Sequence, residues 1–289
     1  TPAPPAPPEG TAVSEPMTTA IEVEAAGSAR SVPASDGTTH VEYDLVITNA
    51  FTADVTLTEL VIRDDTGGEL RRLGGDDLRA ITFRLFSTDP VVTVPPSTAV
   101  ALIVDLPMPP ERAGDMPAAL QHEVSYTVPD TAPARALIGA TTVRGPRVEV
   151  DRSPPTVVAS PLRGAGWLDF NGCCLASSAH RMTLLPTEGD YRAFEMFAID
   201  WVQVRGENVF DGAGAQLTDH YAYGSEVHAA TAGEVVGVRN DQPEAPVNAS
   251  STGNPTVREP RDAAGNHVVV RLAPDRFAVY AHLQTGSVR

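Results

Sequence analysis

Short runs of alternating apolar and polar residues, separated by proline and glycine, fill the first half of this 289-residue sequence. In the clearest run, residues 39–49, every second side chain is apolar: Val41, Tyr43, Leu45 and Ile47. The side chains between them are mostly polar: His40, Glu42, Asp44 and Thr48. A period of two residues places the two sets on opposite faces of a strand, so we expect one buried and one solvated face. Further strands are expected at 20–25, 54–63, 81–86, 99–106, 122–128 and 136–143.

This succession of short antiparallel strands over residues 17–150 predicts an immunoglobulin-like β-sandwich, in a chain whose fold class is all-β. Nothing in the region indicates a functional site. His40 and His122 stand among polar residues of expected strands and are not expected to bind a ligand. The acidic pairs at 64–65 and 76–77 match no EF-hand spacing and are interpreted as solvated loops. The region is therefore expected to be a spacer or docking domain.

The segments on either side of this region are rich in proline. Residues 1–16 predict a disordered, extended tether. Such a tether commonly follows a removed signal peptide or a lipid anchor, so we expect a secreted, periplasmic or cell-surface protein, with a lipid anchor upstream of residue 1 as one option. No apolar run is long enough for a transmembrane helix. Residues 151–163 begin with Asp-Arg-Ser-Pro-Pro and predict a linker.

Composition excludes several classes of function. The 21 basic residues are all arginine, and 37 acidic residues give a net charge of −16. This balance argues against nucleic acid and anionic membrane surfaces as partners. Without lysine, the chain has no Schiff base, no Walker-type phosphate site and no biotinyl or lipoyl carrier. The two cysteines, Cys173 and Cys174, are adjacent and favour buried thiols or a structural bridge over a catalytic pair.

Asp200 is the first candidate for chemistry because it stands in an apolar run, Phe-Ala-Ile-Asp-Trp-Val-Gln-Val at 197–204. In a strand, both faces of this run are apolar, so the carboxylate is expected to be at least partly buried. An unpaired buried carboxylate costs several kcal/mol or takes up a proton. Asp200 therefore needs an arginine, backbone donors or a metal ion as its partner. The residues alone favour the first two, because structural pairs are commoner than metal sites.

Three more pieces follow Phe-Ala-Ile-Asp in order. They are Tyr-Gly-x2-Val-x-Ala-x3-Gly-x-Val at 223–235, Gly-Asn-His-Val-Val-Val at 265–270 and Tyr-Ala-His-Leu at 280–283. Together the four pieces resemble the lysostaphin-like zinc endopeptidases of bacterial cell walls, over about residues 164–289. The resemblance implies a small antiparallel β-barrel, a duplicated hybrid motif, that uses Zn2+ to hydrolyse peptidoglycan peptides.

The resemblance also implies roles for individual residues. Asp200 matches the aspartate ligand of zinc, and His282 matches the active-site histidine that does not bind the metal. Where the commonest family pattern has the first histidine ligand, this sequence has Met196. The nearest upstream histidine, His180, is therefore taken as the ligand; the alternative is a loop histidine beside the cysteines. Three residues at the start of the second piece or just before it are expected to border the cleft and contact substrate: His220, Tyr221 and Tyr223.

The sequence departs from the family pattern in one respect, because it contains no His-x-His motif. In the family this motif completes the zinc ligands, so we expect the peptidase domain, 164–289, to be incomplete at its C-terminus. Three hypotheses remain open. The first is an exported zinc endopeptidase that hydrolyses peptide cross-links of peptidoglycan. The second is a non-catalytic relative that binds wall peptide or activates another hydrolase without metal. The third is an adhesive β protein in which an arginine pairs with Asp200.

Overall fold

The computed structural model describes residues 17–110, 114–173, 176–249 and 253–289, so the expected tether at 1–16 lies outside the described residues. These residues form a nearly all-β fold with a single α-helix. No helix among them is long and apolar enough to cross a membrane. The chain divides into two compact units, the first made of residues up to 153 together with 173–198, and the second of 154–172 together with 199–289.

The first unit contains the elements β1 (Ile21–Ala25), β2 (Ala29–Pro33), β3 (Thr39–Asn49), β4 (Val55–Asp64), β5 (Glu69–Gly74), α1 (Gly75–Ile81), β6 (Thr82–Arg84), β7 (Thr93–Val94), β8 (Ala99–Met108), β9 (Ala119–Thr127), η2 (Arg135–Leu137), β10 (Thr142–Arg144), β11 (Val148–Asp151), β13 (Leu184–Thr187) and β14 (Asp190–Ala193). Eleven of its strands form one sheet in the order β5-β4-β9-β11-β2-β3-β8-β6, with β1 beside β3, β7 beside β4 and β10 beside β9. All pairs in this sheet are antiparallel except β11 with β2.

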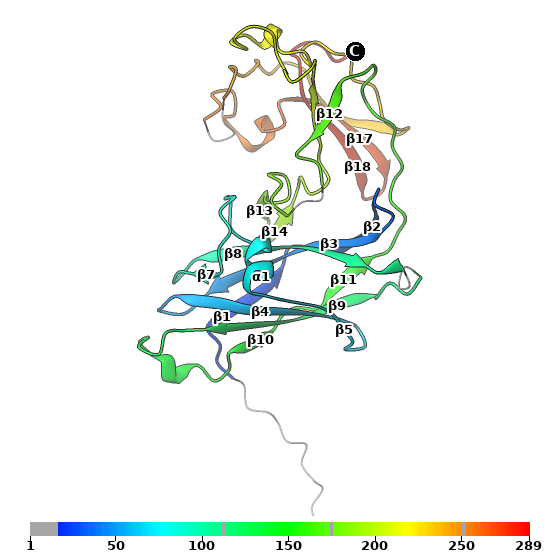
Figure 1. Ribbon diagram of the computed structural model, residues 1–289. Helices are drawn as coiled ribbons and strands as arrows, with labels where there is room; N and C mark the ends of the chain where they lie inside the picture. Colours follow the sequence, from blue (N-terminus) through cyan, green and yellow to red (C-terminus); the bar gives the residue numbers. More distant parts are fainter. Residues whose placement is uncertain (1–16, 111–113, 174–175, 250–252) are drawn as a thin grey trace, which may run out of the picture. The chain divides into compact units, whose positions relative to one another are not determined.

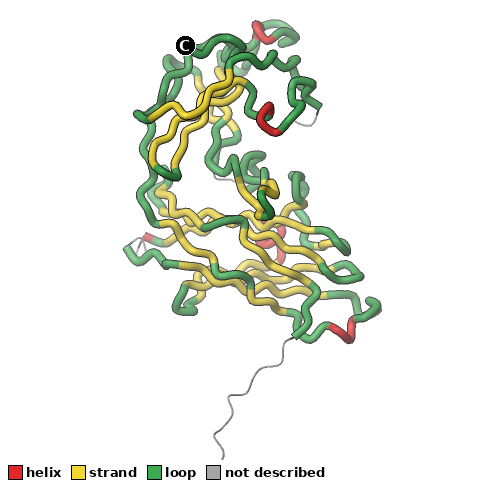
Figure 2. Tube along the Cα trace, turned by 180° about the vertical axis from the view of Figure 1, so that it is seen from behind, coloured by secondary structure: helices red, strands yellow, loops and turns green. Residues whose placement is uncertain are grey.

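The sheet curls on itself (Figures 1 and 2), and its strands enclose one hydrophobic core. The apolar residues of β3 that alternate along the sequence are all buried: Val41, Tyr43, Leu45 and Ile47. They pack in one cluster with residues of β4, β8 and β9, including Leu60, Leu102 and Val124. The predicted buried face of β3 is therefore confirmed. The strand expected at 136–143 is wrong, because a 3-10 helix occupies Arg135–Leu137 and β10 begins only at Thr142.

A second, smaller core covers the opposite face of β3 and β8. Val46 and Ile103 lie on that face and pack with Met182 and Leu184 of the segment Cys173–Ala198. The segment contains the hairpin of β13 and β14. From the sequence, this segment was predicted to belong to the domain 164–289. In the structure it packs in the first unit. The physical reason is that its apolar side chains are buried against an apolar patch of the first sheet.

The second unit has two small sheets. β12 (Trp167–Phe170) pairs with β15 (Asp200–Gln203), and β16 (Glu234–Arg239), β17 (Asn266–Ala273) and β18 (Arg276–Leu283) form an antiparallel sheet in that order. The short helices η3 (Leu217–Asp219) and η4 (Pro260–Asp262) lie in its loops. The Gly-Asn-His-Val-Val-Val piece at 265–270 lies at the start of β17, and the Tyr-Ala-His-Leu piece at 280–283 lies at the end of β18. Most of the piece at 223–235 is irregular, and only its end lies in β16.

Candidate functional site

The polar face of β3 is buried, contrary to the expected solvated face. The side chains of Glu42 and Asp44 have no exposed surface, because the segment Cys173–Ala198 covers them. These side chains alternate with the core residues, so the strand buries both of its faces. The alternation with a period of two therefore predicted the strand correctly. It did not predict that the polar face is buried, because a segment far along the sequence covers that face.

Arg181 neutralises part of this buried charge and is itself fully buried. Its Nη2 lies 3.1 Å from Oε2 of Glu42 and 3.1 Å from Oδ1 of Asp44. Its Nη1 donates to Oδ2 of Asp44 over 3.3 Å, and its Nη2 donates to the carbonyl oxygen of Val104 over 3.4 Å. A buried arginine needs such partners because removal from water costs several kcal/mol per ion.

Glu42 and Asp44 share this one guanidinium, so its attraction does not outweigh the effect of burial on their pKa values. Burial raises the pKa of Glu42 to about 7, and the attraction of Arg181 offsets only part of that rise. Burial raises the pKa of Asp44 to about 6, against the same attraction. Neither oxygen of Glu42 has a hydrogen-bond partner among the described residues, since the guanidinium lies at ion-pair distance without hydrogen-bond alignment.

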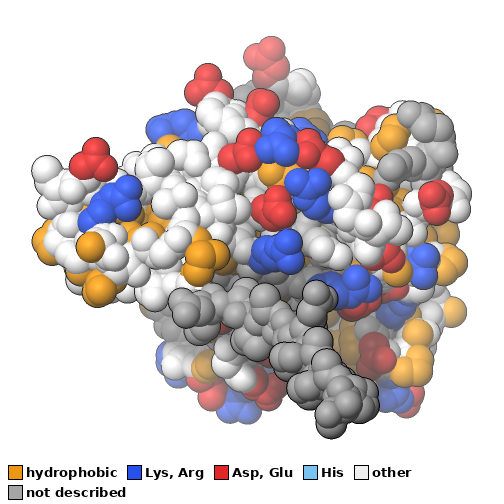
Figure 3. All heavy atoms as spheres, turned by 90° about the horizontal axis from the view of Figure 1, so that it is seen from below, with side chains coloured by type: hydrophobic (Ala, Val, Ile, Leu, Met, Phe, Trp, Pro, Cys, Tyr) orange, Lys and Arg blue, Asp and Glu red, His pale blue; other side chains and the backbone are white. Residues whose placement is uncertain are grey.

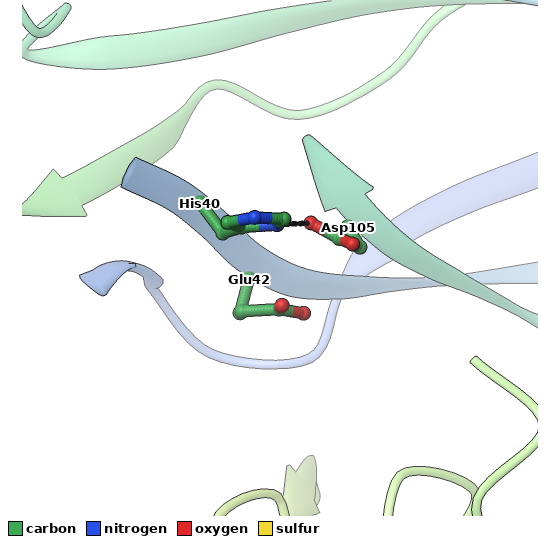
Figure 4. Close-up of side chains that lie close together, drawn as sticks. All are labelled: His40, Glu42 and Asp105. Carbon is green, nitrogen blue, oxygen red and sulfur yellow. Dashed lines mark hydrogen bonds and ion pairs between the residues drawn. The ribbon is translucent and has the colours of Figure 1, made fainter. Parts of the chain in front are cut away.

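His40 and Asp105 lie beside Glu42 (Figure 4). His40 precedes Glu42 by two positions on β3, and Glu42 is the register partner of Asp105 on β8. His40 Nδ1 lies 2.5 Å from Oδ1 of Asp105, and its Nε2 lies 3.1 Å from Oδ2 of Asp36. Burial lowers the pKa of His40, but its hydrogen bonds to Asp105 and Asp36 outweigh burial, so the pKa rises.

Histidine and carboxylate side chains in this arrangement are potential metal ligands. One ligand atom each from His40, Glu42 and Asp105 lie within 4.8 Å of one another. Within the part of the chain that the structure describes, no other group of three such residues comes as close. From its sequence context, His40 was not expected to bind a ligand. The missed signal was the spacing His40-x-Glu42 on one strand with Asp105 on a second expected strand.

His122 was also expected among solvated groups, and this expectation is wrong. The ring is buried, with Nε2 2.9 Å from the Tyr43 hydroxyl and Nδ1 3.1 Å from the Pro146 carbonyl oxygen. Burial lowers its pKa, although the contact with Pro146 acts in the opposite direction. His122 is therefore a structural histidine inside the first unit.

The two predicted zinc ligands lie in different units. His180 is half-buried in the segment Cys173–Ala198, and its Nδ1 lies 3.0 Å from the carbonyl oxygen of Ala198. Asp200 begins β15 in the second unit, where it is half-buried and accepts a hydrogen bond of 2.9 Å from Nδ2 of Asn171. The expected partial burial of Asp200 is confirmed, and its pairing with His180 stays a prediction. Cys173 is disulfide-bonded, and Cys174 lies outside the described residues.

His282 lies near the end of β18 in an unusual backbone conformation. Its φ is +57°, in the left-handed region that few residues other than glycine adopt. The pairing of β17 with β18 shifts register at this point, between Asn266 and Val268. A register shift of this kind is a β-bulge, which redirects side chains and is frequent beside active sites. The imidazole of His282 is exposed.

The Gly-Asn pair at 265–266 has a local structural role next to this bulge. Gly265 has φ +60°, and the carbonyl oxygen of Ala264 accepts a hydrogen bond of 3.0 Å from the His282 amide. Buried Asn266 exchanges two hydrogen bonds with the backbone of Gln242, at 2.8 and 2.9 Å. The motif therefore anchors the long loop before β17 and fixes the backbone on which His282 lies.

Tyr223, a predicted substrate contact, is tied to the end of β18. Its hydroxyl donates to Oε2 of Glu244 over 2.8 Å and accepts from Nε2 of Gln284 over 3.1 Å. The hydrogen bond to Glu244 raises the pKa of Tyr223. Gln284 follows His282 by two positions, so the structure brings Tyr223 into the neighbourhood of the bulged strand end.

The other two predicted contacts, Tyr221 and His220, are held in the same loop. The Tyr221 hydroxyl donates to Oδ1 of Asp211 over 2.8 Å, and the Arg205 guanidinium lies 4.2 Å from the centre of its ring. The hydrogen bond to Asp211 raises the pKa of Tyr221. His220 Nε2 lies 3.3 Å from the carbonyl oxygen of Gly214. The loop is thus braced by its own side chains, and substrate contact by these residues stays a prediction.

Comparisons with known proteins give no family for this chain. No protein-family model matches the sequence, and no curated protein is significantly similar to it. Among solved structures, the X-ray structure of Northeast Structural Genomics Consortium target SoR45 is similar over 45% of this chain and 86% of its own, with 14% identity and a TM-score of 0.27. A likeness at this level carries no functional argument.

Proposed function

We propose that this chain is an exported zinc-dependent endopeptidase that hydrolyses peptide cross-links of bacterial peptidoglycan. In this proposal an immunoglobulin-like β-sandwich precedes a lysostaphin-like barrel built from a duplicated hybrid motif. The observation that carries the proposal is the bulge at His282, where an exposed imidazole stands on a left-handed backbone. Such strained positions persist only when the surroundings enforce them, and they cluster at active sites.

The residue types available for the metal are suitable. Imidazole and carboxylate are zinc donors, and His180 and Asp200 supply one of each. When bound, zinc supplies Lewis-acid polarisation of the scissile peptide carbonyl. Asn171 fixes the orientation of the Asp200 carboxylate through its hydrogen bond to Oδ2. Ligand carboxylates are commonly held in this way, so Asn171 is a positioning residue.

His282 and the loop that carries Tyr221 and Tyr223 have separate roles in this reaction. An imidazole can donate a hydrogen bond or carry a proton, so His282 donates a hydrogen bond to the developing oxyanion or moves a proton to the leaving amine. The ordered rings of Tyr221 and Tyr223 form a wall against which a peptide packs. Their hydroxyls are held by Asp211 and Glu244, which keeps the two rings in place.

The experiment compares the protein with its Asp200→Asn variant on purified peptidoglycan. New free amino groups measure hydrolysis, and bound zinc is measured by mass spectrometry after dialysis against a zinc buffer. We expect the variant to lose hydrolysis and one zinc per chain. Asp190→Asn serves as the matched control, because Asp190 is an exposed carboxylate of β14, the strand that precedes β15 in the sequence. Hydrolysis that persists in Asp200→Asn would reject the assignment.

A second function is a metal-free barrel that binds wall peptide or activates another hydrolase; it is favoured by the hydrogen bond from Asn171, which gives the Asp200 carboxylate a partner without a metal. It predicts that the protein sediments with peptidoglycan but releases no amino groups, and that Asp200→Asn changes neither property. The same assay therefore separates the two functions.

A further inference from the structure

We infer that His40, Glu42 and Asp105 form a zinc-binding site in the first unit, separate from the proposed peptidase site. The three side chains come from adjacent antiparallel strands, and their ligand atoms lie within 4.8 Å of one another. One imidazole and two carboxylates make a donor set that suits zinc better than calcium or magnesium, which prefer oxygen ligands alone.

Glu42 is the observation that points to an ion. Its side chain is fully buried, and neither carboxylate oxygen has a hydrogen-bond partner among the described residues. Arg181 lies 3.1 Å from Oε2 of Glu42, and a carboxylate oxygen of Glu42 also lies within 4.8 Å of ligand atoms of His40 and Asp105. Arg181 also pairs with Asp44, so the two buried carboxylates of Glu42 and Asp44 face a single buried guanidinium. A divalent cation supplies the missing positive charge.

The second ring nitrogen of His40 has the partner that a metal-binding histidine usually has. Nδ1 faces Asp105, whereas Nε2 lies 3.1 Å from Oδ2 of Asp36. Metal-binding histidines commonly donate their other N–H to a carboxylate, which orients the ring and strengthens the ligand. In the inferred site Nδ1 binds zinc and Nε2–H donates to Asp36, so the imidazole stays neutral.

Zinc binding requires a small opening of the site. Two donors on one tetrahedral zinc lie about 3.3 Å apart, given bonds of about 2.0–2.1 Å. The distance between His40 Nδ1 and Asp105 Oδ1 is 2.5 Å, so the two side chains have to separate by roughly 1 Å. The Arg71 guanidinium does not oppose this movement, because its Nη1 donates to the backbone carbonyl oxygen of Asp105 over 3.4 Å.

The test uses the whole chain carrying Asp200→Asn, so that the proposed peptidase site is disabled. The protein is stripped with EDTA and titrated with Zn2+ by calorimetry. We expect one zinc per chain, a loss of at least 100-fold in affinity after His40→Gln, and a loss of about 10–100-fold after Asp36→Asn. Asp105→Asn provides a second ligand variant if His40→Gln misfolds, and circular dichroism without zinc checks the fold of each.

Asp89→Asn is the matched control, because Asp89 is an exposed carboxylate of the same unit. It should bind zinc as tightly as its parent. The inference is overturned if the Asp200→Asn chain binds no zinc, or if the His40 and Asp36 variants bind as tightly as their parent. Failure of the peptidase proposal has a different result, in which Asp200→Asn leaves the zinc content of the wild-type chain unchanged.

Discussion

Arg181 donates a fully buried hydrogen bond of 3.3 Å to Asp44, a residue 137 positions away in the sequence. The bond fastens the segment Cys173–Ala198 to β3. His180, the proposed zinc ligand, directly precedes Arg181 in that segment. The packing of the first unit therefore holds the segment in which His180 lies.

Replacing Arg181 with leucine should destabilise the first unit strongly. The change leaves Glu42 and Asp44 buried without their cation, which costs about 3–5 kcal/mol in measured cases. Urea unfolding followed by circular dichroism measures the change. Arg192→Leu, which breaks an exposed ion pair with Asp190 in the same segment, should change the free energy of unfolding by less than about 1 kcal/mol.

The exposed ion pairs explain why this comparison is informative. Acidic and basic side chains are interspersed over the face seen in Figure 3. In the first unit, Arg72 forms exposed ion pairs with Glu59 and Glu69. Such pairs are screened by water and contribute little. Equal losses for Arg181→Leu and Arg192→Leu would contradict a special role for the buried arginine. Adding Glu42→Gln and Asp44→Asn to Arg181→Leu should recover part of the loss.

Glu42 should make folding stability depend on pH. Its pKa is about 7 in the folded chain against an ordinary value of 4.5, so the folded state binds the extra proton between these values. The resulting stabilisation is complete below pH 4.5 and is lost as the pH rises through 7. The wild-type chain should therefore lose stability relative to Glu42→Gln over this range, measured by urea unfolding with EDTA present.

This prediction is tested by the difference in the free energy of unfolding between the wild-type chain and Glu42→Gln, and not by the wild-type value alone. His122 has a lowered pKa and destabilises the fold as the pH falls, which opposes the effect of Glu42 in the wild-type curve. Both chains retain His122, so its contribution cancels in the difference. A difference that stays constant from pH 4.5 to 8 would show that Glu42 does not titrate as described.

His282→Ala should separate catalysis from metal binding. In the proposed function His282 transfers a proton or stabilises the oxyanion and is not a zinc ligand, so the variant should keep its zinc. Its kcat should fall by about 100- to 10,000-fold, the usual contribution of a general acid or base. His267→Ala is the control, since the His267 ring contacts the backbone carbonyl oxygen of Gly265. Loss of zinc from His282→Ala would refute the assigned role.

The sequence alone predicted β3 and its buried face, together with β1, β4, β8 and β9, because side-chain alternation is a local property with a period of two residues. It also located Asp200 as a partly buried carboxylate, since the residues around it are apolar. Neither prediction needs knowledge of distant contacts. The resemblance of four short pieces to the lysostaphin-like peptidases is likewise local, which is why it names residues without fixing their positions in space.

Only the tertiary structure decided where the polar face of β3 goes. Burial of Glu42 and Asp44 depends on Arg181 arriving from far along the chain, and no local pattern encodes that meeting. The same holds for His40 and Asp105, which meet because β3 and β8 pair in one register. The left-handed backbone of His282 likewise follows from the shifted pairing of β17 with β18. Local alternation sets which side chains share a face, and long-range packing sets what that face contacts.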